Sequence, residues 1–102
     1  MPASLVEAMR ILHDNGFPQV RKEGNALRIE TTARGDGPVE YRLVLKYDEK
    51  QPEIAVEAAW VRSIMDQPSD ENDITLTWEN DNASTFIEEK IEKIEQLLKL
   101  RK

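Results

Sequence analysis

The stretch LRIETTARGDGPVEYRLVLKY, residues 27–47, decides the fold of this chain. Small or apolar side chains alternate with polar or charged ones through residues 27–34 and again through residues 39–47. A period of two places the two sets of side chains on opposite faces of a strand. Residues 35–38 (GDGP) between them have the composition of a turn. We therefore predict an antiparallel hairpin with one buried face and one solvent-facing face.

The same alternation predicts further strands on either side of this hairpin. Residues 54–61 and 74–79 continue it, and a short strand around residues 19–22 precedes the turn Gly24-Asn25. The two later strands are expected to place these apolar side chains on the inner face: Ile54, Val56, Ala58, Trp60, Ile74, Leu76 and Trp78. The outward face is expected to show four apolar residues among charges: Val44, Ala55, Ala59 and Val61.

A helix is predicted near each end of the chain. Ser4 and Glu7 have the spacing of a capping box, and Asn15-Gly16 supplies a left-handed end to the first helix. Thr85 and Glu88 have the same capping-box spacing before the second helix. The apolar stripe of the second helix consists of Ile87, Ile91, Ile94, Leu97 and Leu98.

These elements together predict an α+β fold in which residues 1–102 form a single domain. We expect one antiparallel meander sheet of four to five strands, with the N-terminal and C-terminal helices packed on one face. The stripe of the second helix covers about two heptads, fewer than an independent coiled coil needs. It is therefore expected to pack on the sheet of its own chain.

The composition excludes several kinds of chemistry. The chain has no cysteine, which excludes disulfides, thiolate metal sites and cysteine nucleophiles. No apolar run approaches the roughly 20 residues of a membrane-spanning helix. The N-terminal residues lack the features of a signal peptide, so we expect a cytoplasmic location. The net charge of −6 disfavours direct binding to the phosphates of nucleic acids.

The net charge is concentrated in one segment, residues 66–81. Residues 1–65 hold ten acids and nine bases, and residues 82–102 hold four acids and five bases. Residues 66–81 hold six acids and no base, so they carry a charge equal to that of the whole chain. Since charge steers protein encounter, we predict that this acidic segment binds a partner. Its acidic residues are Asp66, Asp70, Glu71, Asp73, Glu79 and Asp81.

No motif indicates catalysis, a cofactor or a metal. His13 is the only imidazole, and the end of a helix favours a histidine without any catalytic role. Residues 35–37 (GDG) precede a strand rather than a helix, which excludes a phosphate-binding loop. The acids in residues 66–73 lack the ligand spacing and the glycine of a calcium loop. We expect no catalytic, cofactor-binding or metal-binding residue.

The function expected from these features is that of a small non-enzymatic interaction protein. As an inhibitor or adaptor it would dock the acidic segment on a basic surface of another protein, for instance as a phage-type inhibitor of a nucleic-acid-handling complex. Two alternatives remain. One is a dimeric chaperone or scaffold that uses a sheet edge or a helix face. The other is a small-ligand-binding domain or enzyme with a pocket between sheet and helices.

Two families offer a partial resemblance. Residues 47–54 (YDEKQPEI) resemble the Y-P-x-x-x-P-x-I turn of RWD domains, but Asp48 stands where that family has proline. A strand is also expected at residues 74–78, where RWD domains are helical. Small acidic type III secretion chaperones are similar in size, but they place a helix between their strands, and residues 62–72 do not have a helical pattern. Neither resemblance assigns a role to any residue of this chain.

Overall fold

The computed structural model describes residues 4–35, 39–51, 53–63, 74–75 and 81–99. The strands within these ranges form one antiparallel sheet, in which their spatial order is their order in the chain. The α+β meander predicted from the sequence is thus confirmed. The elements are α1 (Leu5–Asp14), β1 (Val20–Glu23), β2 (Ala26–Arg34), β3 (Val39–Asp48), β4 (Ala55–Ser63), β5 (Ile74–Thr75) and α2 (Asp81–Leu97).

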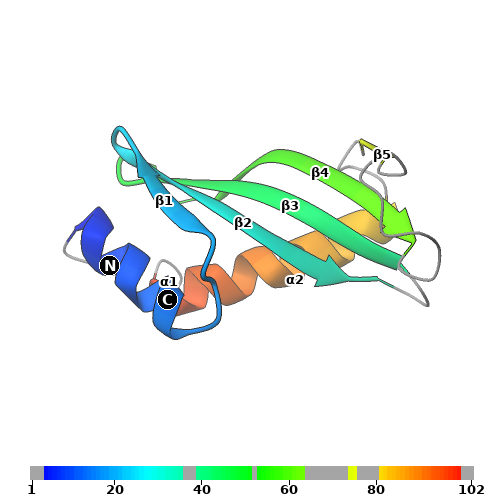
Figure 1. Ribbon diagram of the computed structural model, residues 1–102, viewed down its shortest axis with the longest axis horizontal. Helices are drawn as coiled ribbons and strands as arrows, with labels where there is room; N and C mark the ends of the chain where they lie inside the picture. The colour runs from blue at the N-terminus through cyan, green and yellow to red at the C-terminus, as the bar shows by residue number, and fades with distance from the viewer. Residues whose placement is uncertain (1–3, 36–38, 52, 64–73, 76–80, 100–102) are drawn as a thin grey trace.

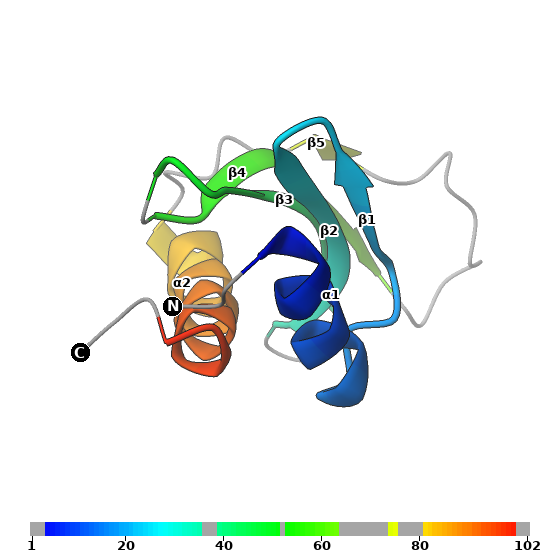
Figure 2. The same cartoon turned by 90° about the vertical axis from the view of Figure 1, so that its left-hand side faces the viewer.

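Both helices lie on one face of the sheet, as predicted (Figure 1, Figure 2). Helix α1 packs against β1 and β2, while α2 packs against β2 and β3 and also touches α1. The two helices therefore differ in what they cover: α1 lies under one end of the sheet, whereas α2 runs along its length (Figure 1). The buried core fills the space between sheet and helices. Its fully buried members from the sheet, from α2 and from the residue that follows α2 are Leu27, Ile29, Leu43, Leu45, Tyr47, Ile87, Ile94 and Leu98.

Helix α1 begins and ends where the local sequence predicts. The Ser4 hydroxyl accepts a hydrogen bond from the Glu7 backbone N–H at 3.1 Å, which satisfies one of the orphan donors of the first turn. Gly16 adopts φ +94°, a conformation that costs glycine little, and the Phe17 N–H then donates to the Leu12 carbonyl at 2.9 Å. The helix buries Leu5, Ala8 and Leu12.

The second helix starts earlier than the capping-box spacing of Thr85 and Glu88 predicts. The helix begins at Asp81, so Thr85 lies inside it and is not its N-cap. A serine or threonine followed by glutamate also occurs within helices, because the propensity of either residue for the helix interior is only mildly unfavourable. The apolar stripe is placed correctly: Ile87, Ile94 and Leu98 are at most 1% exposed and belong to the core of this chain.

Strand β4 contains one residue more than β3 over the length of their pairing. Val44 lies opposite Ala58, and the next residue, Leu45, lies opposite Val56. Glu57 is the extra residue, and it forms a β-bulge. Because side chains alternate with a period of two, one extra residue exchanges the two faces for the rest of the strand.

The inner-face prediction is therefore wrong for the part of β4 that follows the bulge. Ala59 is 2% exposed and Val61 packs against the core, although uninterrupted alternation places both outside. Ala58 and Trp60 lie opposite Val44 and Arg42 and share their outward face, although the same alternation places both inside. The predicted inner positions of Leu76 and Trp78 lie outside the described residues.

Within the described ranges, no helix is long and apolar enough to cross a membrane.

The neighbouring alanines Ala58 and Ala59 provide a direct test of the bulge. We expect Ala59→Asp to lower the free energy of unfolding by at least about 3 kcal/mol, because it buries a carboxylate on the core side. Ala58→Asp, on the outward face, should change it by less than about 1 kcal/mol. Urea unfolding of the two variants measures both values. A larger loss for Ala58→Asp would mean that the alternation runs through β4 without a bulge.

Candidate functional site

The face of the sheet opposite the two helices is the candidate site (Figure 2). We call this surface the open face. Each of its three long strands contributes side chains that point away from the core, as the pairing register shows. The open face consists of Arg28, Glu30 and Thr32 from β2, Arg42, Val44 and Lys46 from β3, and Ala58 and Trp60 from β4.

Trp60 and Arg42 form the central contact of the open face. The two residues are directly opposite each other on β4 and β3, and the Arg42 guanidinium carbon lies 5.9 Å from the centroid of the Trp60 ring. A guanidinium at this distance from an indole face makes a cation–π interaction. Trp60 is half-buried, so its ring contributes apolar area to the surface while its position is fixed by a neighbour.

Three bases lie side by side across one end of the open face. Arg21 of β1 is opposite Arg28, and Arg28 is opposite Lys46. Like charges directly opposite each other destabilise a sheet, so this row requires compensation.

Two glutamates provide that compensation. The Glu23 carboxylate lies 3.5 Å from a terminal nitrogen of Arg21 and 4.0 Å from Nε of Arg28. Glu30 accepts a hydrogen bond from Arg28 in a salt bridge. The side chain of Arg28 is 30% exposed, less than those of its acidic partners, so it is the part of this network held most firmly against the sheet.

Two hollows flank the Trp60 ring. The larger, about 530 Å³, lies between the ring and the loop at Gly16 and Pro18. The smaller, about 370 Å³, extends from the ring toward Lys46 and Glu57. Val44 lines both hollows and is only 6% exposed, so it forms an apolar floor between them. Each hollow therefore combines an apolar surface with charges of both signs, a lining that suits the side chains of another protein.

None of the six residues predicted as the partner-binding site belongs to the open face as defined above. Five of them lie outside the described residues: Asp66, Asp70, Glu71, Asp73 and Glu79. Asp81 is the first residue of α2. His13 lies exposed in the last turn of α1, at the place that the sequence predicts.

Sequence reasoning missed the central residue of the open face because it placed Trp60 in the core. Every residue from Ala58 to Val61 is apolar, so either alternation buries only apolar side chains, and the sequence pattern does not decide between them. The only available signal is Glu57, a charged residue between two apolar pairs. A bulge leaves its extra residue unpaired with the opposite strand, where a charge remains in contact with water.

Among the described residues, no group of three or more histidine, cysteine, aspartate or glutamate side chains could hold a metal ion. Comparison with protein families, with curated proteins and with solved structures finds no match for this chain.

Removing the charges of Glu23 and Glu30 tests whether they compensate the row of three bases. We expect the double variant Glu23→Gln, Glu30→Gln to lower the free energy of unfolding by about 1 kcal/mol at low salt, because the three bases then repel without a counter-charge. High salt should reduce this loss by screening the repulsion. The control Glu53→Gln, Glu88→Gln removes two exposed acids elsewhere. An equal loss in the control, or a loss that salt does not reduce, would contradict the compensation.

Proposed function

We propose that this protein is a small non-enzymatic interaction protein that docks on a partner protein through its open face, with Trp60 and Arg42 at the centre of the contact. The observation that carries the proposal is the outward position of Trp60. The bulge at Glu57 places a large aromatic residue on the face without a helix, next to Arg42, while Ala58 and Val44 lie beside this pair on the same face. Tryptophan and arginine are the residue types most enriched at interaction hot spots.

The charges of the open face favour a protein as the partner over a nucleic acid. Arg28, Arg42 and Lys46 alternate with Glu30, and Glu23 and Glu57 line the same hollows. These carboxylates repel phosphates, and so does the net charge of −6. A partner protein whose surface carries charges of both signs could place its bases opposite these carboxylates and its acids opposite the arginines and the lysine, and would not be repelled in this way.

We further propose that the acidic segment, residues 66–81, guides the partner's approach. Its support is the sequence: six acids without a base attract a basic surface over distances longer than those of direct contacts. The protein would then act as an inhibitor or adaptor in the cytoplasm. A basic partner surface is typical of nucleic-acid-handling complexes, so a phage-type inhibitor of such a complex is the most specific version of this proposal.

The contribution of Trp60 can be measured once a partner has been captured. Immobilised wild-type protein is exposed to extract from its source cells, and bound proteins are identified and purified. We expect Trp60→Ala to weaken the binding of the true partner at least about 30-fold, the loss typical of a hot spot. Val6→Ala removes a side chain that is 62% exposed on α1 and serves as the control, with a change below about twofold. Unchanged affinity of a folded Trp60→Ala variant would refute docking through the open face.

The guiding role of the acidic segment predicts a kinetic effect. Neutralising four of its acids should slow association and remove most of its salt dependence, with little change in dissociation or in stability. Stopped-flow mixing with the purified partner at low and high salt measures both rates. The test variant carries Asp66→Asn, Asp70→Asn, Glu71→Gln and Asp73→Asn. The control variant has the same change in net charge, with Glu49→Gln, Glu53→Gln, Glu88→Gln and Glu89→Gln. Equal association rates for the two variants would refute a role specific to residues 66–81.

A further inference from the structure

Strand β2 is longer than the strand that pairs with its outer edge. The register of β1 on β2 ends at Val20 opposite Ile29, and one further hydrogen bond joins the Glu30 N–H to the Gln19 carbonyl at 2.8 Å. Beyond Glu30, no described segment pairs with β2 on this side, whereas β3 pairs with β2 as far as Arg34 on the other side.

The hydrogen-bonding direction of each residue in this uncovered part follows from the alternation. The Gly35 N–H donates to the Val39 carbonyl at 2.9 Å, so the odd-numbered residues of β2 point their backbone groups toward β3. The Glu30 N–H points the other way, toward β1. Thr32 and Arg34 therefore direct their N–H and C=O groups outward from the edge. An uncovered edge of this kind is a template for another extended chain.

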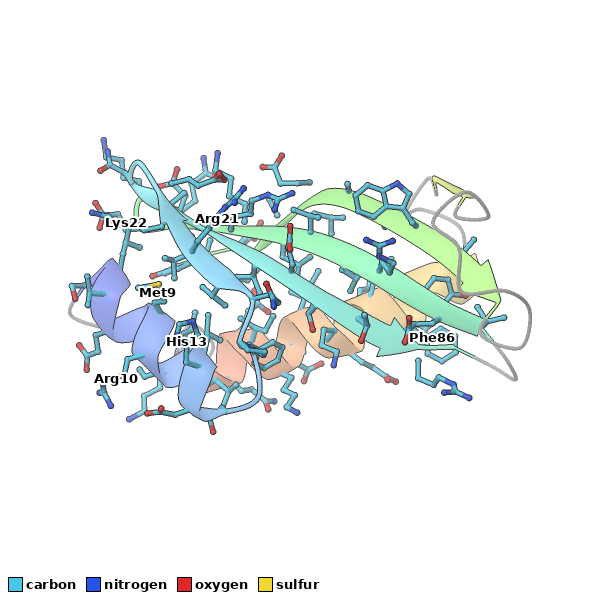
Figure 3. All side chains as sticks on the ribbon, in the orientation of Figure 1. Met9, Arg10, His13, Arg21, Lys22 and Phe86 are labelled. Carbon is cyan, nitrogen blue, oxygen red and sulfur yellow. The ribbon has the colours of Figure 1, made fainter. Side chains whose placement is uncertain are left out.

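A groove lies beneath this edge, between β2 and α2. It has a volume of about 250 Å³ and is lined by Ala33, Arg34, Phe86, Glu89, Lys90 and Lys93. The groove is open because α1 lies at the other end of the sheet. Figure 3 shows this separation, with Phe86 near the end of β2 and His13 and Met9 far from it on α1.

The groove has an excess of positive charge. Arg34, Lys90 and Lys93 face a single acid, Glu89, among its lining residues. The ammonium groups of Lys90 and Lys93 lie 5.7 and 5.8 Å from the centroid of the Phe17 ring. Among the salt bridges of the described residues, none includes these three bases.

The two lysines are also electrostatically unfavourable for each other. Burial lowers the pKa of Lys90 from its ordinary value, and the charge of Lys93 lowers it further. A negative charge bound in the groove would oppose both effects, since it favours the protonated ammonium.

We propose that the uncovered edge of β2 and the basic groove together bind an extended acidic peptide, which adds to the sheet as a strand beside Thr32 and Arg34. The backbone of the peptide pairs with the two outward-facing residues of β2. Its carboxylates, on the side toward α2, contact Lys90 and Lys93, and Arg34 adds a further positive charge to the lining of the groove. Main-chain hydrogen bonds then supply affinity, and the charges supply selectivity for acidic sequences.

A second copy of this chain is a poorer occupant of the same edge. Two copies paired through β2 in antiparallel fashion would bring both Arg34 side chains and both lysine pairs to the same interface. Like charges across a strand pair are destabilising, so the edge disfavours its own duplicate.

The probe for this proposal is a short synthetic peptide of alternating valine and glutamate, capped at both ends. Titration into the isotopically labelled protein, followed by amide NMR, should give saturable shifts at Thr32 and Arg34. Hydrogen exchange of these two amides should slow when the peptide is bound. The same peptide with N-methylated valines keeps its charge but loses backbone donors, and it should bind at least about tenfold more weakly. A valine–lysine peptide should show no saturable binding.

Variants separate this site from other surfaces. Lys90→Gln and Lys93→Gln should each weaken the acidic peptide at least about threefold, and added salt should reduce this difference. Lys22→Gln is the control because it removes an exposed lysine of β1, on the part of the edge already formed by another strand (Figure 3). Its effect should stay within the error of the titration.

Several results would overturn the proposal. One is the absence of saturable binding of the valine–glutamate peptide, and another is amide shifts confined to the open face or to β1. The others are binding of the lysine peptide or the N-methylated peptide as tight as that of the valine–glutamate peptide, and equal losses of affinity for Lys22→Gln and Lys93→Gln. Analytical ultracentrifugation of the free protein provides a further test. A dimer that breaks when Thr32 is replaced by proline would assign the edge to a second copy.

Discussion

The extra residue at Glu57 is the constraint on which the two faces of the sheet depend. Before it, Val56 lies opposite Leu45 on the core side, and after it Ala59 and Val61 take the core side. Without the extra residue, a strand of this sequence would have to bury Trp60 and turn Val61 outward. The bulge therefore determines both faces of β4: Ala59 and Val61 lie against the core, and the indole of Trp60 lies on the face without a helix.

The position of Trp60 then determines the character of the open face. A cation–π contact with Arg42 fixes the ring, and hollows on both sides of it share an apolar floor at Val44. The charges around them come from Arg28, Glu30, Arg42 and Lys46 on β2 and β3. Their arrangement is not random, since the row of Arg21, Arg28 and Lys46 is balanced by Glu23 and Glu30 on the same strands. A surface of this kind is charged around one large apolar side chain, that of Trp60.

A second asymmetry arises from unequal lengths. Strand β1 is shorter than β2, and α1 covers only the end of the sheet where β1 lies. At the other end, no described segment pairs with the outer edge of β2, which lies above α2. Natural proteins protect such edges with charge, and Arg34, Lys90 and Lys93 supply it here. The same bases that discourage pairing with a second copy are suited to an acidic strand, so protection and recognition are compatible at this edge.

Local patterns in the sequence were sufficient for most of the architecture. The alternation in residues 27–47, the turn at Gly24 and the cap at Ser4 each act over a few residues, and the structure contains all three. The apolar stripe from Ile87 to Leu98 likewise predicts which side of α2 meets the core. The spacing of Thr85 and Glu88 was less informative, because a capping pattern does not prevent a helix from starting earlier.

What the sequence determined by itself is the α+β class and the buried face of the hairpin, since these follow from periodicity and turn chemistry. What only the tertiary structure decided is the order of the strands, the orientation of β4 after Glu57 and the part of β2 that no described strand covers. Residues 58–61 are all apolar, so local patterning gives both orientations a similar energy. Pairing with β3 and packing against the core select one of them, and that choice places Trp60 on the open face.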